Sequence, residues 1–351
     1  MKLYQITEIT EKFNNAGTKA NADIAKVADA MGFKAVSVRM ATTQHSAYGK
    51  VLRQVGYYRD WKKATEAIPA GSTLLLQHPF HHKQMTREAC LRELKKKDVK
   101  IISFVHDVEE LRKFRYSDYY KKEFQTMLEI ADVMIVHNEV MKQWFIERGI
   151  PKEKLITLGI FDYLRDAVPG KKAFKKSLTV AGNLDTTKCG YIAELGKISG
   201  IKFNLYGSGF EDSLSKYENI KYHGEFPVDT IPEKLTGGFG LVWDGNSIDG
   251  CKGDAGQYLR YNNPHKLSLY MSSGLPVVIW SGAAEAEFVR ENNVGICVDS
   301  IEDMVNILET MTEADYDRLC DNVNYISEEL RKGTHTQKAL NQALHRIGVP
   351  L

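Results

Sequence analysis

The segment YNNPHKLSLYMSSGLPVVIW, residues 261–280, has the residue types and spacing of an anion-binding helix start. Asn263 is a favoured N-cap residue, and Pro264 suits the first turn of a helix. Gly274 then ends the helix before the apolar strand PVVIW. Lys266 falls in the first turn, where free N–H groups and the helix dipole favour an anion over a cation. We therefore predict a bound diphosphate at Lys266; the alternative is a solvated surface lysine.

A second candidate is the strand end AGNLDTTKCGY, residues 181–191. Backbone N–H groups around Gly182 and Asn183 can approach a phosphate closely in such a turn, and Lys188 can add positive charge. The pattern is weak alone, since strand–glycine–turn–helix segments are common in α/β proteins. It gains weight because it falls in the same half of the chain as Lys266.

Two more strand ends in this half, LYGSGF and YHGEFP, carry glycine and aromatic residues. We expect Tyr206 and Gly207 to contact a nucleoside and the backbone near Phe226 to contact its base. Packing is the alternative for both aromatic side chains. The glycine-rich segment that follows the strand FGLVW, residues 244–258, predicts a mobile loop that closes over the ligand.

In the first half, FVHDVEELR places ionisable side chains at a strand end: His106, Asp107, Glu109 and Arg112. These are candidates for acid–base chemistry, and the structural alternative is helix capping by Asp107 with a salt bridge between Glu109 and Arg112. The earlier segment NNAGTKAN contains Gly17 and Thr18, which are suited to backbone contact with a sugar or phosphate. A plain strand-to-helix turn explains that segment equally well.

Histidines follow other predicted strands, namely His78, His81, His82 and His137, but none has a zinc-ligand spacing. The chain also lacks a D-x-D motif of the kind that holds Mn²⁺ or Mg²⁺ against a diphosphate. We therefore expect no metal and no cofactor. Stabilisation of a diphosphate would then depend on Lys266, Lys188 and helix N-termini.

The elements that position these residues alternate between short apolar runs and helical patterns, as in parallel sheets covered by helices. The predicted strands are KLYQI, KAVSV, TLLLQ, KIISFV and VMIV, then SLTVAG, IKFNLYG, NIKYHG, FGLVW, PVVIW and GICV. Three helical stretches follow residue 301. The pattern predicts an α/β fold with two Rossmann-like domains facing a central crevice, where the carboxyl ends of the strands bind the ligand.

The basic segment VPGKKAFKK, residues 168–176, separates the two series and predicts an exposed linker. We expect an N-terminal domain over 1–167 and a C-terminal domain over 177–330. Residues 331–351 should form a helix that packs back on the N-terminal domain.

Composition narrows the possible partners of this chain. A net charge of +2 over 351 residues gives no long-range field that requires nucleic acid. No apolar run approaches the ~18 residues of a membrane span, and the start does not resemble a signal peptide. Five scattered cysteines predict reduced thiols rather than disulfides, so we expect a cytoplasmic protein.

The pieces AGNL, LYG, GLVWDG, NNPHKLSLYMSSGLPVV, NNVGI, NNAGTKAN and HD-x-EELR together resemble a known family. They are similar to the bacterial glucosyltransferases that add the second sugar to GlcNAc-modified serine-rich repeat adhesins, which are related to galactofuranosyltransferases. The resemblance covers nearly the whole chain. It implies the GT-B fold, a UDP-hexose donor, a GlcNAc on Ser or Thr as acceptor, no metal and homo-oligomers.

By the same resemblance, Lys266 and Lys188 would hold the diphosphate, while Tyr206 and the segment near Phe226 would hold uridine. The N-terminal domain would carry the acceptor side. There we predict Asp107 as the base in an inverting reaction, since a carboxylate is already deprotonated at neutral pH. His106 would orient this base or contact the donor sugar, and Glu109 is the next candidate.

One departure separates the chain from many retaining GT-B enzymes, which carry a paired-glutamate arrangement before the G-x-P-V-V strand. Leu269 stands where the second glutamate would be expected. Glu285 and Glu287 remain candidates for contact with ribose or sugar hydroxyls. The sequence also leaves open the hexose, an epimerase or hydrolase acting on a UDP-sugar, and a non-catalytic acceptor-binding subunit. The lysines and the HD-x-E residues argue against the last of these.

Overall fold

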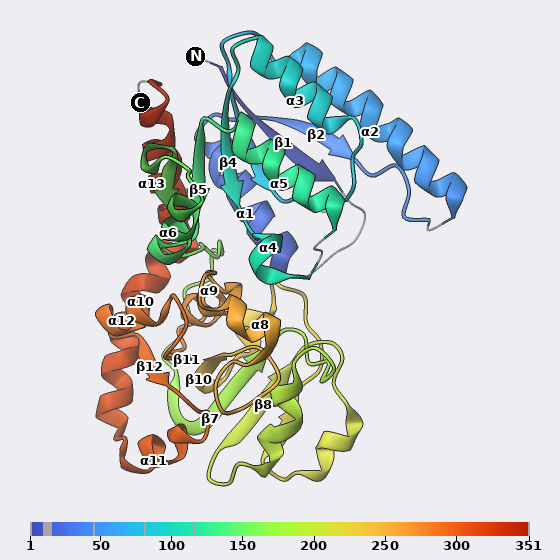
Figure 1. The fold of residues 1–351 in the computed structure, drawn as a ribbon. Coiled ribbons are helices and arrows are strands. Elements are labelled where there is room, and N and C mark those ends of the chain that lie inside the picture. The colour runs from blue at the N-terminus through green and yellow to red at the C-terminus, as the bar shows by residue number, and fades with distance from the viewer. Residues whose placement is uncertain (1, 10–15, 45, 81, 115–116, 350–351) are drawn as a thin grey trace. The chain divides into compact units, whose positions relative to one another are not determined.

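The computed structural model describes residues 2–9, 16–44, 46–80, 82–114 and 117–349. These residues divide into two compact units, each built around one parallel sheet (Figure 1). The first unit draws on Met1–Phe13, Asn21–Leu158 and Thr336–Leu351, and the second on Asn14–Ala20 and Gly159–His335. The last helix of the chain therefore belongs mostly to the first unit.

The sheet of the first unit has six strands in the order β2-β1-β3-β4-β5-β6. They are β1 (Leu3–Ile9), β2 (Lys34–Arg39), β3 (Thr73–His78), β4 (Lys100–Val105), β5 (Val133–Val136) and β6 (Leu155–Thr157). Its helices are α1 (Ala16–Ala30), α2 (Ala47–Ala67), α3 (Arg87–Lys96), α4 (Glu109–Arg112), α5 (Asp118–Ile130), α6 (Glu139–Glu147), the short η1 (Lys152–Lys154) and α13 (Thr334–Arg346). β3 is buried along its whole length, as expected for a parallel strand covered on both faces.

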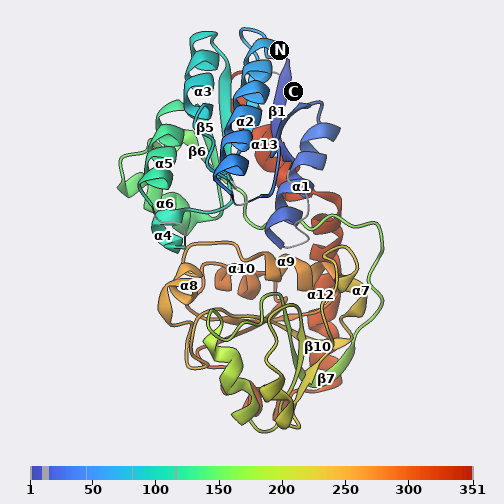
Figure 2. The same ribbon diagram turned by 90° about the vertical axis from the view of Figure 1, so that its right-hand side faces the viewer.

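The sheet of the second unit also has six strands, in the order β12-β11-β10-β7-β8-β9. They are β7 (Ala173–Ala181), β8 (Lys202–Tyr206), β9 (Ile220–Tyr222), β10 (Gly237–Val242), β11 (Val277–Trp280) and β12 (Gly295–Val298). The helical segments are η2 (Gly190–Lys197), η3 (Asp212–Lys216), α7 (Ile231–Lys234), α8 (Gly253–Tyr258), α9 (His265–Ser272), α10 (Ala286–Glu291), α11 (Asp303–Thr310) and α12 (Glu313–Lys332). α9 packs against β10 and α12 (Figure 2).

Every strand expected from the sequence is present, and the α/β prediction is confirmed. The short β6 was missed. The predicted linker 168–176 was wrong at its end, because β7 begins at Ala173, which pairs with Gly237. Lys175 and Lys176 lie in this exposed first part of β7, so their charges hide the strand pattern.

The three helices expected after residue 301 are α11, α12 and α13. Thr312 and Asp315 form a capping box at the start of α12, and Gly333, with φ of +76°, ends it. Arg346 of α13 donates to the carbonyls of Glu153 and Leu155 in the first unit.

Candidate active site

The helix α9 begins at His265, so Lys266 lies in its first turn as the sequence predicts. The N-cap residue is Pro264, and no side chain caps the helix. The prediction that Asn263 caps α9 was wrong, because the buried Asn263 amide donates to the carbonyl of Gly159 at 3.0 Å. The first-turn N–H groups of α9 thus lack a side-chain cap, as an anion site requires.

Two contacts fix α9 against the sheet of the second unit. The Tyr270 hydroxyl accepts the N–H of Ala181, the last residue of β7, at 2.8 Å. Gly240 in β10 faces the Tyr270 ring so closely that a Cβ there would collide with it. The rigid sheet therefore sets the position of the first turn of α9.

Lys266 is held at the carboxyl ends of β7 and β10. Its Nζ donates to the Trp243 carbonyl at 3.0 Å and lies 3.4 Å from Oδ2 of Asp244. The side chain keeps only 19% of its exposure, so Lys266 is not the solvated surface lysine of the alternative interpretation. Burial disfavours the charged form, but the Asp244 carboxylate together with Tyr191, Cys189 and Tyr270 outweighs it, and the pKa of Lys266 is raised well above its ordinary value.

Asp244 is a site residue that our sequence analysis missed. It follows the buried strand β10 almost directly, and its side chain is 30% exposed beside Lys266. The available signal was its place at a strand end, the same criterion that selected Asp107. The Cys189 thiol also lies 3.7 Å from the Asp244 carboxylate, and burial raises the pKa of that thiol to about 11.

Two glycines bring the ends of β7 and β8 together. Gly182 and Gly207 have φ of +134° and +136°, which disfavours any side chain. A Cβ on Gly207 would collide with the carbonyl oxygen of Gly182, and one on Gly182 would lie 3.7 Å from Cε of Lys266. The predicted residues Gly182, Gly207 and Lys266 are therefore neighbours in the structure.

The turn after Gly182 is organised by Asp185. Its carboxylate accepts the N–H of Thr187 at 2.9 Å, and the Asn183 side chain accepts the N–H of Asp185 at 3.3 Å. Lys188 is largely exposed, with its Nζ 3.8 Å from Asp185. A 3-10 helix, η2, follows where the sequence indicated a helix.

Tyr206 packs in the core of the second unit. It is 1% exposed, its ring stacks on His223 at 4.5 Å between centroids, and its hydroxyl donates to the Lys234 carbonyl at 3.2 Å. Phe226 packs on the same core, 6.2 Å from the Tyr206 ring. Packing, the alternative interpretation, thus accounts for both side chains, and a base contact by the backbone near Phe226 stays a prediction.

The segment 244–258 is more ordered than the predicted loop. Its last six residues form α8, Cys251 is fully buried, and the Trp243 indole donates to the Ser247 carbonyl at 2.9 Å. Closure of this segment over a ligand stays a prediction.

Glu285 and Glu287 flank the start of α10 and differ in exposure. Glu285 is the N-cap residue and is 2% exposed, whereas Glu287 is exposed in the first turn. Both were predicted to contact ribose or sugar hydroxyls, and Glu287 is the more accessible of the two for such a contact.

Gly17 and Thr18 lie in the first turn of α1, and the preceding residues 10–15 fall outside the described part of the chain. This start of α1 belongs to the second unit. Lys19 anchors it there, because its buried Nζ donates to the Leu164 carbonyl at 2.9 Å and lies 4.9 Å from the centre of the Tyr163 ring.

In the first unit, His106 and Asp107 follow β4. The His106 N–H donates to the His78 carbonyl at 2.7 Å, and its Nε2 lies 2.7 Å from Oε1 of Gln77. Asp107 pairs with Arg112 at 2.6 Å, and Glu109 lies 3.6 Å from the same guanidinium. The N-cap of α4 is Val108, so Asp107 is not the cap that the alternative interpretation assumed.

A pocket of about 130 Å³ lies beside these residues in the first unit. It is lined by His78, Pro79, Glu109, Glu110, Tyr120, Lys121, Phe124 and Gln125. Glu109 lines it, whereas His106 and Asp107 do not. Carboxylates, an amide and aromatic rings are groups that bind sugar hydroxyls and apolar sugar faces, so the pocket suits a sugar.

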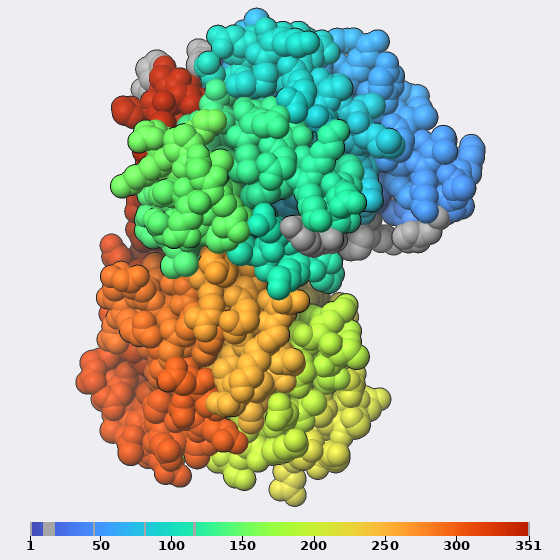
Figure 3. Space-filling view, in the orientation of Figure 1, coloured from blue at the N-terminus to red at the C-terminus, as the bar shows by residue number. Residues whose placement is uncertain are grey.

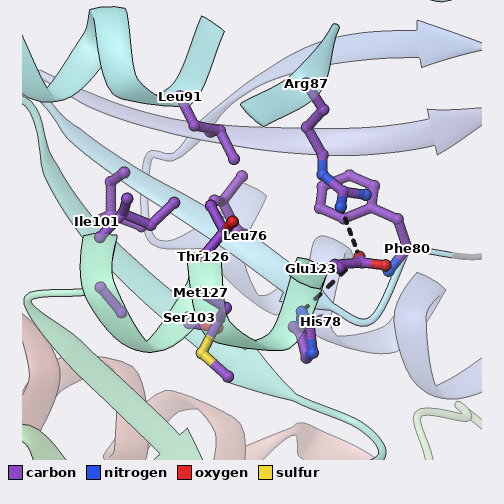
Figure 4. A pocket seen from close by; sticks show the side chains of 12 residues that line it. Leu76, His78, Phe80, Arg87, Leu91, Ile101, Ser103, Glu123, Thr126 and Met127 are labelled. Carbon is purple, nitrogen blue, oxygen red and sulfur yellow. Dashed lines mark hydrogen bonds and ion pairs between the residues drawn. The ribbon is translucent and has the colours of Figure 1, made fainter. Parts of the chain in front are cut away.

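A smaller cavity of about 20 Å³ adjoins β3 on the side of α3 and α5 (Figure 4). Arg87 and Glu123 form an ion pair of 2.9 Å across it, and His78 lies 3.9 Å from Glu123. Burial raises the pKa of Glu123, and burial together with Arg87 lowers the pKa of His78 to about 3. The cavity has room for about one water, which indicates a structural role.

Comparison with known proteins identifies the family. Residues 3–160 match the N-terminal domain of glucosyltransferase 3-like proteins, and residues 178–343 match the C-terminal domain. The chain belongs to the glucosyltransferase 3-like family. The resemblance drawn from the sequence is thereby confirmed, and the protein is a hexosyltransferase.

The chain is 36% identical over 251 residues to the beta-1,6-galactofuranosyltransferase WbbI of Escherichia coli (strain K12), covering 70% of this chain and 71% of that relative. It is 25% identical over 333 residues to glucosyltransferase 3 of Streptococcus gordonii, covering 93% and 94%. Anabaena HepE, whose structure contains UDP and glucose, superposes with a TM-score of 0.63 at 12% identity over 98% of this chain and 99% of that one. The fold is accordingly GT-B.

Among the described residues, no group of three or more His, Cys, Asp or Glu side chains is arranged to hold a metal ion. Within the same part of the chain, no helix is both long and apolar enough to cross a bilayer.

Proposed function

We propose that the protein transfers a hexose from a UDP-sugar to an acceptor hydroxyl. The observation that carries this proposal is Lys266, a buried lysine kept charged by Asp244 at the uncapped start of α9. A lysine in a first turn is locally unfavourable unless an anion compensates its charge. The UDP found in Anabaena HepE, which has the same fold, supports a uridine diphosphate as that anion.

The chemistry follows from charge. As the bond between the hexose and the diphosphate breaks, negative charge grows on the leaving oxygen of UDP. The Lys266 ammonium and the first-turn N–H groups of α9 stabilise that charge, and Gly182 leaves space beside them because it has no side chain. Lys188, whose side chain is largely exposed, adds positive charge from the solvent side. No metal is required in this scheme.

The acceptor binds in the 130 Å³ pocket of the first unit. Glu109 lines this pocket, whereas Asp107 is engaged by Arg112 at 2.6 Å and lies outside the lining. Because Glu109 lines the pocket and Asp107 does not, we place Glu109 ahead of Asp107 as the group that removes the acceptor proton, with His106 positioning the strand end.

For the donor and acceptor we propose glucose and a GlcNAc-modified Ser or Thr of a serine-rich protein. Glucosyltransferase 3 of Streptococcus gordonii, which aligns over 93% of the chain, supports a glucosyl donor. Galactofuranosyl transfer is the second candidate, and the higher identity to the Escherichia coli galactofuranosyltransferase favours it.

A donor panel decides between the two candidates. Purified protein is incubated with UDP-glucose, UDP-galactose, UDP-GlcNAc or UDP-galactofuranose, each with and without a GlcNAc-peptide, and products are identified by mass and linkage. We expect transfer from UDP-glucose that depends on the acceptor. Transfer from UDP-galactofuranose alone would replace glucose as the donor, and turnover without any acceptor would indicate a hydrolase or epimerase.

We also propose that the protein works in the cytoplasm, as a homo-oligomer. The five free cysteines support the first point. Light scattering of the purified chain tests the second, and a monomer would contradict it.

A further inference from the structure

Helix α2 of the first unit carries an apolar stripe on its outward face. Tyr48, Val51, Leu52, Val55 and Tyr58 recur at helical spacing and are 70%, 61%, 37%, 50% and 52% exposed. Single exposed apolar residues are normal, but a contiguous row of large ones marks an interaction surface. We call these five residues the α2 stripe.

The orientation of α2 is fixed, so the stripe is a stable feature. Its inner face buries Tyr57, Trp61 and Ala64, and the Trp61 indole donates to the Gln84 side chain at 2.6 Å. The helix lies beside β2 and α3, and its surface is the blue region on the right-hand side of Figure 3.

A further apolar residue extends the stripe. Gln54 of α2 donates to the Lys83 carbonyl at 2.8 Å and accepts the N–H of Met85 at 3.0 Å. These bonds hold the backbone of Met85 beside α2, and Met85 is 78% exposed.

The charge around the stripe is mainly positive. Arg59, Lys62 and Lys63 are exposed in the second half of α2, and Glu66 is an exposed acid near its end. The other acidic residue of the helix is Asp60, whose carboxylate accepts the N–H of Arg39 at 2.9 Å. The outward surface of α2 is thus apolar along its first three turns and carries three basic side chains and one acidic side chain beyond them.

We propose that the α2 stripe docks on an anionic lipid surface. A helix with exposed Tyr and Val side chains beside Lys and Arg has the chemistry of an element that lies in the bilayer interface. The lysines and Arg59 would meet acidic headgroups, while Val51 and Val55 enter the boundary with the acyl chains. The helix lies on the surface and does not cross it.

A second copy of the chain is a poorer occupant. Antiparallel pairing of two stripes about Arg53 would match Val51 with Val55 of the other copy. It would also bring Arg59 against the start of the other α2, which is the positive end of that helix. Acidic lipid neutralises the same cations, so charge complementarity favours the bilayer.

The test is co-sedimentation of the full chain with vesicles. One set contains equal parts of phosphatidylglycerol and phosphatidylcholine, and the other contains phosphatidylcholine alone. We expect binding to the anionic set only, weakened at about 0.5 M salt because surface charges are then screened. Two α2 variants are compared with the parent: R59Q/K62Q/K63Q, which removes three charges, and V51S/V55S, which removes two apolar side chains.

Each basic residue near an acidic surface changes the partition coefficient by about fivefold, so R59Q/K62Q/K63Q should bind on the order of 100-fold more weakly. V51S/V55S should lose roughly tenfold or more, because two exposed valines no longer enter the bilayer. The matched control is K176Q/K202Q/K221Q, which removes three exposed lysines of the second unit and should bind like the parent.

Equal binding to both vesicle sets, or equal loss in the control variant, would overturn the proposal. So would the absence of binding by the parent. A change of mass for V51S/V55S in light scattering without vesicles would instead assign the stripe to a contact between copies of this chain.

Discussion

Replacing Lys266 by Met is the most direct test of the proposed donor site. Met has a similar length, but it cannot make the charge-assisted hydrogen bond to a diphosphate, which contributes about 1.5–3 kcal/mol. That free energy corresponds to a rise of roughly 10- to 150-fold in the dissociation constant of UDP. Because the Lys266 side chain is only 19% exposed, solvent screens this contact less than it screens a contact at the surface.

Isothermal titration calorimetry with UDP gives the measurement. Lys188→Met is the matched control, since Lys188 is 61% exposed and spaced only three residues from its partner Asp185. Exposed pairs of this kind contribute about 0–1 kcal/mol, so the control should change UDP affinity less than about fivefold. A wild-type UDP affinity for Lys266→Met would refute the assignment.

Loss of folding must be separated from loss of binding. Lys266→Met leaves the Asp244 carboxylate without its cation in a half-buried site, and we expect a lower melting temperature. The double variant Lys266→Met/Asp244→Asn removes both charges and should recover much of that stability. If the double variant melts like the parent but still binds UDP weakly, the binding loss belongs to Lys266 itself.

Three further outcomes are expected. Glu109→Gln should bind UDP normally and lose transfer by ~10²–10⁴-fold, as when a general base is removed. If Glu109→Gln transfers sugar at the parent rate, Asp107 becomes the candidate base, and Asp107→Asn is measured in the same way. Transfer should persist in excess EDTA; full loss restored by Mn²⁺ would reveal a metal site. Burial lowers the pKa of His78 to about 3 and of His137 to about 4, below the ~6.5 of an unfolded histidine, so the unfolded state binds more protons. Stability should therefore fall between pH 7 and 5, by up to about 2 kcal/mol for each histidine, and an unchanged melting temperature would contradict this.

The sheets could be predicted because buried parallel strands read as short apolar runs. TLLLQ and FGLVW correspond to β3 and β10, which are buried throughout. β6 was missed although Leu155 and Ile156 are buried, whereas the equally short β9 was predicted, and the start of β7 was missed because its lysines point to solvent. Local patterns thus revealed the strands with long buried runs, but not every short one.

The contacts within the site were harder to predict because they join residues distant in sequence. Asn263 matched the rule for an N-cap, yet its amide bonds to Gly159, 104 positions earlier. The first-turn place of Lys266 could be predicted, but its partner Asp244 lies in the loop after β10, 22 positions earlier. Tyr206 was expected at a ligand; its ring stacks on His223 in the core, and its contact with a nucleoside stays a prediction. Sequence rules identify candidate residues at the ends of strands, and tertiary packing decides which of these residues contact one another.

The pair of Lys266 and Asp244 also explains how a buried lysine persists when no nucleotide is bound. Burial and the positive end of α9 both disfavour the ammonium, and Asp244 makes the largest contribution among the groups that offset burial. A diphosphate carries more negative charge than one carboxylate, so it can compete for Lys266. In the proposed site we expect the carboxylate then to repel the bound anion and to help UDP leave after transfer. On this reasoning Asp244→Asn should bind UDP more tightly than the parent, as measured by calorimetry near neutral pH, and turn over more slowly where product release limits the rate. Weaker UDP binding by Asp244→Asn would mean that the carboxylate is needed to keep Lys266 charged.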